Sequence, residues 1–168
     1  MKISMYTMSA DTFLPMLKNL QKLLEKGAAH AAAKKFDTSV LCNSRLAPDM
    51  FPLTFQVQVA TDHAKGASAR LAGVESPKFE DNKDATYADL QTRVQKTIDF
   101  IETLKPESFE GSEDRDVTVT VPGKSWQMKG LPYLKTWALP NFYFHYITAY
   151  NLLRHNGVEV GKRDFLGA

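Results

Sequence analysis

The chain has 168 residues, of which 43% are hydrophobic and 24% are charged, as is typical of one soluble globular domain. Lys and Arg (21) nearly balance Asp and Glu (19), which excludes the single-sign field expected of a nucleic-acid-binding protein. The sequence has neither the apolar run of a membrane span nor the apolar core of a secretory signal. The lone Cys42 suits a reducing compartment. We therefore expect one cytoplasmic domain over residues 1–168, with no nucleic-acid or membrane partner.

The first helical pattern covers residues 10–27, where leucines and a phenylalanine recur at spacings of three and four. Pro15 lies within this pattern, so the helix either begins near the proline or bends there. Gly27 favours an end at that point, although the alanines that follow could carry the helix further. Residues 30–50 are then expected to form a connector with one short helical turn.

A second helix is predicted to begin near Pro48, because proline is well placed at a first helical position and Asp49 complements the positive end of the helix dipole. Pro52 is tolerable within the first turn of such a helix. The helical pattern continues from there to Gly73, and a polar loop follows over residues 74–85.

A third helix is predicted over residues 87–105, preceded by Thr86 and Asp89, which resemble a capping box. Residues 115–130 then change to the period of two that is typical of strands, with valines alternating with threonines. Residues 122–123 are Pro-Gly, which favours a type II turn. We therefore predict a small β-hairpin that packs on the helices.

A fourth helix is predicted over about residues 131–156, with a kink at Pro140 and a left-handed cap at Gly157. Four long amphipathic segments, with one hairpin between the third and the fourth, predict an all-α fold, a four-helix bundle. The long connector after the first helix allows a crossover connection in place of simple up-and-down order.

Two histidines lie on helix faces that could carry chemistry. Gln56, Gly66 and Arg70 share the face of His63 on the second helix. The corresponding face of the fourth helix is apolar apart from a polar island, which consists of Asn141, His145 and Thr148. Should the two faces meet, a pair of imidazoles and a third ligand would suit a divalent metal such as zinc or nickel. The alternative is that both histidines are hydrogen-bonded core residues.

Three blocks of the sequence resemble a bacterial domain-of-unknown-function branch of the DinB/YfiT-like superfamily: LAPDMFPLTFQVQVATDHAKGASARLAG, GSEDRDVTVTV and LPNFYFHYITAYNLLRHNGVEVGKRDFLG. The resemblance covers nearly the whole chain. It implies a four-helix bundle with a crossover connection, usually dimeric. It also implies a divalent metal held by one histidine of the second helix and an H-x-x-x-H pair of the last helix. Several members of the superfamily are metal-dependent transferases or isomerases that use small thiols.

The resemblance places the second-helix histidine at His63 and the H-x-x-x-H pair at Asn141 and His145, so an asparagine stands where the family has its first histidine. With these three as metal ligands, Gln56, Thr148 and Tyr143 are the expected substrate-binding residues. The resulting expectation is a homodimeric, metal-dependent transferase or hydrolase that acts on a small, thiol-linked molecule. The alternative is a metal-free member that serves as a ligand-binding or protein-interaction module.

Overall fold

The computed structural model describes residues 3–80 and 85–168. Its elements in chain order are α1 (Met5–Met8), α2 (Ala10–Lys34), α3 (Ser39–Asn43), α4 (Leu53–Ala72), α5 (Tyr87–Glu102), the 3₁₀ helix η1 (Pro106–Phe109), β1 (Asp116–Val121), β2 (Lys124–Lys129), α6 (Gly130–Tyr133), the π-helical segment η2 (Leu134–Ala138), α7 (Leu139–His155) and α8 (Lys162–Leu166). The chain is therefore mostly helical, with one two-stranded antiparallel sheet, as predicted.

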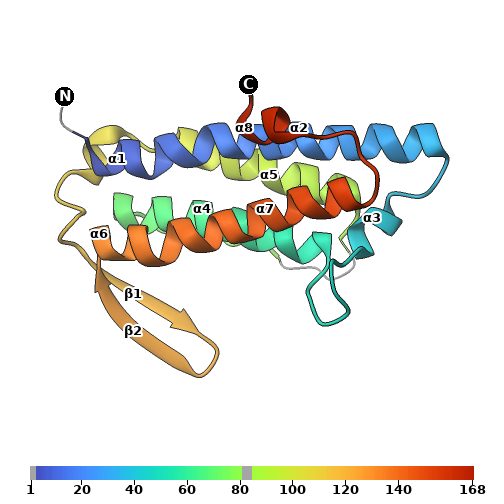
Figure 1. Ribbon diagram of the computed structural model, residues 1–168. Helices are drawn as coiled ribbons and strands as arrows, with labels where there is room; N and C mark the ends of the chain where they lie inside the picture. The colour runs from blue at the N-terminus through green and yellow to red at the C-terminus, as the bar shows by residue number, and fades with distance from the viewer. Residues whose placement is uncertain (1–2, 81–84) are drawn as a thin grey trace.

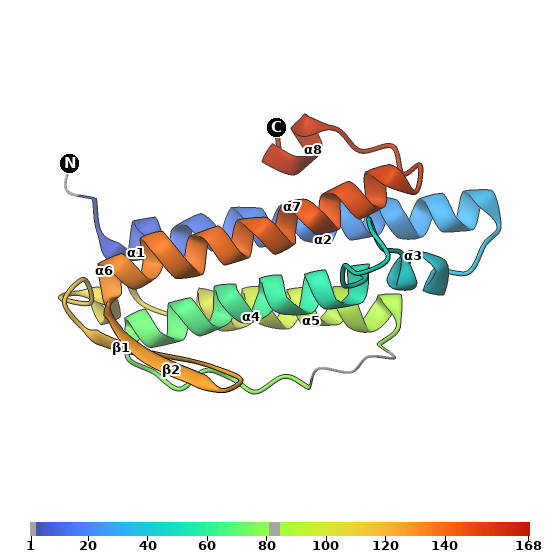
Figure 2. The same ribbon diagram turned by 60° about the horizontal axis from the view of Figure 1, so that its bottom comes forward.

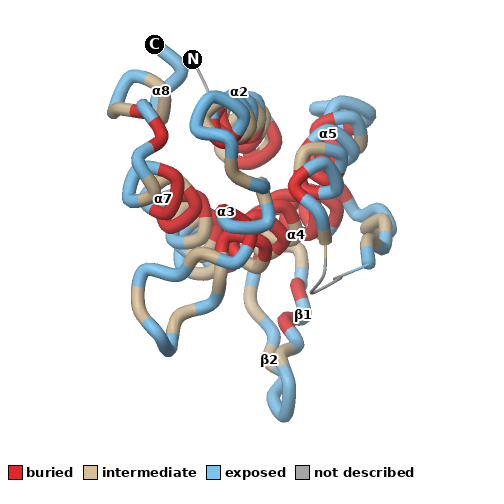
Figure 3. The backbone as a smooth tube through the Cα atoms, turned by 90° about the vertical axis from the view of Figure 1, so that its right-hand side faces the viewer, coloured by how far each residue is buried: buried red, intermediate tan, exposed pale blue. Residues whose placement is uncertain are grey.

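The long helices α2, α4, α5 and α7 lie side by side (Figures 1 and 2). Helix α4 packs against both α7 and α5, and α2 packs against α5. The buried residues face one another across the interior of this group (Figure 3). Helix α4 is buried on most of its circumference, and several of its inward residues are small: Ala60, Ala64, Gly66 and Ala67. Small side chains let neighbouring helices approach closely. Helix α4 can therefore pack against α5 and α7 at the same time.

Helix α2 continues well past Gly27 and ends at Lys34, and the cap residue Lys35 adopts a left-handed backbone with φ 59°. The alanines after Gly27 are the strongest helix formers, so the start of the expected connector is helical. Pro15 lies inside the helix, which begins five residues earlier. Gly27 does not end the helix but marks the place where α5 comes close to α2. The hydroxyl of Tyr87 on α5 passes over this glycine and donates to the carbonyl of Leu24 at 2.9 Å.

Replacement of Gly27 by Ala is expected to destabilise the protein by about 1–3 kcal/mol, the usual cost of overpacking a core. A Cβ atom at this position would lie 2.0 Å from the Tyr87 hydroxyl oxygen. Urea unfolding followed by circular dichroism measures the loss. In a Tyr87→Phe background the clashing oxygen is absent, so the same substitution should cost less; an equal cost in both backgrounds would contradict this packing.

Helix α4 begins at Leu53 and not near Pro48, so the predicted start was wrong. Pro52 has an extended backbone, with ψ 172°, and a residue that precedes a proline is disfavoured in the helical region. Phe51 therefore could not belong to a helix begun at Pro48. The predicted end is confirmed, since Gly73 closes the helix in a left-handed conformation with φ 71°.

The capping box before α5 is confirmed. The Thr86 hydroxyl accepts from the backbone N–H of Asp89, whose carboxylate accepts from the backbone N–H of Thr86. The hairpin is also confirmed, with Val121 opposite Lys124 at its tip. Gly123 has φ 77°, as the second central position of a type II turn requires.

The disturbance expected at Pro140 takes the form of a π-helical segment, η2, directly before α7. Proline has no N–H with which to continue the α-helical pattern, and the N–H of Leu139 donates to the carbonyl of Leu134 five residues back. Beyond α7, Gly157 adopts the predicted left-handed conformation. The C-terminal segment then folds back, and the Tyr146 hydroxyl donates to the carbonyl of Phe165 at 3.0 Å.

Candidate functional site

His63 of α4 and His145 of α7 face each other across the contact between these two helices. Their ring centroids lie 6.0 Å apart, and the ring planes are within 12° of parallel. Both side chains are partly buried. The structure therefore brings together two residues that are 82 positions apart in the sequence, as the expected convergence of the two helix faces requires.

Both imidazoles are neutral at physiological pH. Burial lowers the pKa of His145 to about 4. Burial also lowers the pKa of His63 to about 4, with smaller contributions from the nearby His145 and Arg70. A neutral imidazole keeps a lone pair on one ring nitrogen, which is the state that a metal ion or a proton-accepting role requires.

Gln56, one of the expected substrate-binding residues, fixes the tautomer of His145. Its Nε2 donates to the carbonyl of Phe51 at 3.0 Å, so its Oε1 is directed at the His145 Nδ1, 2.8 Å away. An amide oxygen can only accept, and Nδ1 must therefore carry the proton. This hydrogen bond leaves the lone pair of His145 on Nε2, in the way that outer partners orient histidine ligands of metals.

Asn141 lies one helical turn before His145 on α7. Its Nδ2 donates to the carbonyl of Trp137 at 2.7 Å. The amide nitrogen is thereby engaged, and Oδ1 makes no hydrogen bond to any described residue. Oδ1 is consequently the atom with which Asn141 could contribute to a site.

Arg70 was placed on the His63 face by its spacing, but its role was missed. Its Nη1 donates to the Tyr133 hydroxyl at 3.3 Å. A Cβ atom at Gly66 would lie 2.6 Å from Nη1, so the guanidinium folds back over this glycine toward His63. No sequence signal could have found Tyr133, which is 63 residues from Arg70.

An aromatic group borders the site on the His145 side. The Phe55 ring lies 6.1 Å from the His145 ring, and the Phe144 ring lies 5.1 Å from it. Phe51 stacks on Phe55 with 4.0 Å between centroids. Phe51 is 57% exposed and Phe144 is 56% exposed. Single exposed apolar side chains are common, but these three lie together, and such a group offers an apolar wall to a bound molecule.

The other two expected substrate-binding residues, Thr148 and Tyr143, make their contacts within α7. Thr148 is buried, and its hydroxyl donates to the carbonyl of Phe144 within α7. Tyr143 is half-buried and packs against Phe142. Asp62, which precedes His63 in the chain, pairs with Lys65 and Arg93, each at 2.8 Å.

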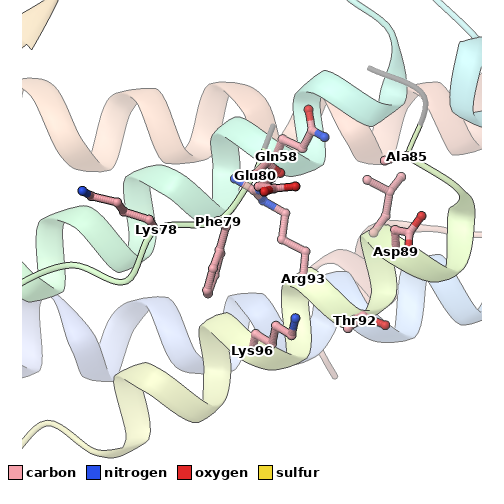
Figure 4. A pocket seen from close by; sticks show the side chains of 10 residues that line it. Gln58, Lys78, Phe79, Glu80, Ala85, Asp89, Thr92, Arg93 and Lys96 are labelled. Carbon is pink, nitrogen blue, oxygen red and sulfur yellow. The ribbon is translucent and has the colours of Figure 1, made fainter. Parts of the chain in front are cut away.

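A cavity of about 410 Å³ lies on the side of α4 that faces α5 (Figure 4). The described residues that line it include Gln58, Lys78, Phe79, Arg93 and Lys96. None of the expected site residues is among them. Arg93 donates to Asp62 at 2.8 Å and lies 5.4 Å from the centre of the Phe79 ring. Its charge therefore helps to hold α4, α5 and the segment before α5 together, and the cavity is separate from the histidine pair.

The spacing of the histidine pair suits two imidazole ligands of one divalent metal ion. Zinc–nitrogen bonds are about 2.0–2.1 Å long, so two imidazoles on one ion have ring centres roughly 5–6.5 Å apart. The observed 6.0 Å lies in this range. The described residues contain no group of three His, Cys, Asp or Glu side chains that could hold a metal. The spacing of the two imidazoles therefore permits one shared metal ion.

Comparison with known proteins identifies the class. A crystal structure of a DinB family member protein from Shewanella denitrificans matches with a TM-score of 0.87 and 42% identity, over 97% of this chain and 92% of that chain. The model of the family described as a domain of unknown function, DUF1993, matches residues 5–166. The chain therefore belongs to DUF1993, within the DinB-like proteins, and the predicted resemblance is confirmed. None of the curated proteins compared with the chain matches it.

The helices give no sign of a membrane span. Over residues 3–80 and 85–168, none combines the length and the apolar character that crossing a bilayer would need.

Proposed function

We propose that the protein is a divalent-metal-dependent enzyme of the transferase or hydrolase type, acting on a small, thiol-linked molecule between α4 and α7. The observation that carries this proposal is the facing pair His63 and His145, with its free Nε2 lone pair on His145. The metal ligands would be these two imidazoles and Oδ1 of Asn141. Imidazole nitrogen favours zinc or nickel over magnesium or calcium.

A metal held there would lower the pKa of a coordinated thiol or water and so provide a nucleophile at neutral pH. The protein's own contribution is to present the ligands in the right state. Burial keeps both imidazoles neutral, and Gln56 holds the His145 ring with Nδ1 protonated. The rings of Phe55 and Phe144 give the site an apolar border on the His145 side.

We further infer that α2, α4, α5 and α7 form a closed four-helix bundle, in which α7 also contacts α2. We also propose that the protein works as a homodimer, as the family resemblance implies. Sedimentation at several protein concentrations tests the assembly.

The proposed function is tested by loading the protein with cobalt(II), a coloured substitute for zinc, and adding a small thiol. A thiolate bound to cobalt produces a charge-transfer band in the near ultraviolet. The band should appear and saturate in the wild type, and it should be absent from His63→Ala. His155→Ala is the matched control, because His155 is an exposed histidine in the last turn of α7. Cobalt binding without a thiolate band would contradict the thiol-linked chemistry.

The alternative function is a metal-free ligand-binding or interaction module. Asn141 favours it, because an amide oxygen is a poor ligand for metals that prefer imidazole. Under this alternative, neither the wild type nor the His155→Ala control binds cobalt at any concentration at which the two proteins remain folded.

A further inference from the structure

Arg70 carries a positive charge that has no carboxylate partner among the described residues. The two buried cations of the neighbouring helices, Arg93 and Lys65, both contact Asp62, whereas Arg70 is exposed at the end of α4. The Arg70 guanidinium instead donates to the neutral hydroxyl of Tyr133. An arginine that is oriented by a neutral partner keeps its full charge and most of its donors for another group.

Gly66 brings this charge close to the histidines. The guanidinium occupies the space in which a side chain at position 66 would lie. Residue 66 is three positions beyond His63, so the two residues lie on one face of α4, about 5 Å apart along the helix axis.

The features along this face follow one another in a fixed order. The aromatic side chains Phe55 and Phe144 contact His145, His145 faces His63, and the Arg70 guanidinium lies beyond His63 over Gly66. An apolar surface therefore lies at one end, two neutral imidazoles lie in the middle, and a cation to which no described carboxylate is bound lies at the other end. A molecule that fits this order has an apolar body and a single anionic group.

We propose that Arg70 binds the carboxylate of the substrate, which is a small organic acid with an apolar body that reaches Phe55 and Phe144. The planar fork of arginine donors matches a carboxylate, to which it can donate two parallel hydrogen bonds. The single charge of Arg70 matches one carboxylate. This inference rests on the proposed function only in using the same site, since the carboxylate contact itself needs no metal.

The test uses 3-phenylpropionate as the probe and 3-phenylpropanamide as its neutral counterpart of the same shape. Binding is followed by NMR through the ring C–H signals of His63 and His145, first in the presence of a chelator. The acid should shift these signals in a saturable way, and the amide should bind at least about tenfold more weakly. Arg70→Ala should weaken binding of the acid about tenfold or more, and Arg70→Lys should retain part of the affinity.

Arg154→Ala is the matched control, because Arg154 is an exposed arginine in the last turn of α7; it should bind the acid as the wild type does. Equal affinity for acid and amide, or an unchanged affinity in Arg70→Ala, would overturn the proposal. Tighter binding of phenyl phosphate than of the acid would overturn the assignment of a carboxylate.

Repeating the titration with one equivalent of zinc separates this inference from the proposed function. In one outcome, binding of the acid in chelator depends on Arg70 and the protein takes up no zinc. This outcome supports the inference, while the proposed function fails. Zinc uptake at the histidines, with acid binding that is indifferent to Arg70, overturns the inference and leaves the proposed function intact.

Discussion

Replacement of Asn141 by His is expected to raise the affinity for zinc about 100-fold, which corresponds to about 2.7 kcal/mol of binding free energy. Asn141 lies one turn before His145 on the same helix, so residues at the two positions can reach one ion. The substitution exchanges an amide oxygen for an imidazole nitrogen, the donor that zinc prefers over a neutral amide. Competition with a coloured chelator measures the change.

Asn151→His is the matched control, since it adds a histidine to an exposed position of α7. It should leave zinc affinity unchanged. A gain in Asn141→His from a weakly binding wild type would support the three-ligand site. A gain from a wild type that binds no zinc would favour the metal-free alternative, and no gain would show that position 141 does not face the site.

Acidification of the metal-free protein from pH 7 to pH 4.5 is expected to cost about 3 kcal/mol of unfolding free energy through the two histidines, after a reduction for their partial exposure. Each histidine has a folded-state pKa of about 4 and an unfolded pKa of about 6.5. Between these values the unfolded state binds more protons, so stability falls as pH falls through this window and levels off below pH 4. The melting temperature should fall by roughly 6–12 °C.

The control is the variant with both His63→Gln and His145→Gln, which should show a much flatter dependence over the same window. The carboxylates with lowered pKa values, Asp37, Asp89 and Asp164, lose their contributions mainly below the ordinary aspartate pKa of 3.8, so they do not dominate this range. Equal pH dependence in the variant and the wild type would contradict neutral, partly buried imidazoles.

The fold was largely predictable because its local signals are strong. The capping box at Thr86, the Pro-Gly turn at Gly123 and the left-handed end at Gly73 each depend on a few neighbouring residues, so the sequence alone locates them. The start of α4 was wrong because two prolines compete there, and the backbone restriction before Pro52 outweighs the favourable first-turn position of Pro48. The role of Gly27 required knowledge of a partner on α5, which the local sequence does not contain.

The candidate site was predictable in part for the same reason. Helical spacing placed Gln56 on the face of His63 and Asn141 on the face of His145. The hydrogen bond between Gln56 and His145 spans 89 residues, and it depends on the packing of α4 against α7. The position of the Arg70 guanidinium depends on a side-chain conformation, which no spacing rule specifies. The aromatic neighbours of His145 were not predicted as part of the site, because exposure cannot be read from a run of apolar residues.

The central claim is that His63 and His145 hold a divalent metal, and elemental mass spectrometry tests it most directly. The untagged protein is purified without chelators, incubated with zinc, nickel and manganese in turn, freed of excess metal and analysed. We predict close to one equivalent of zinc or nickel in the wild type and in His155→Ala, and almost none in His145→Ala. A wild-type protein without metal under every condition, or one whose metal content survives in His145→Ala, would contradict the claim.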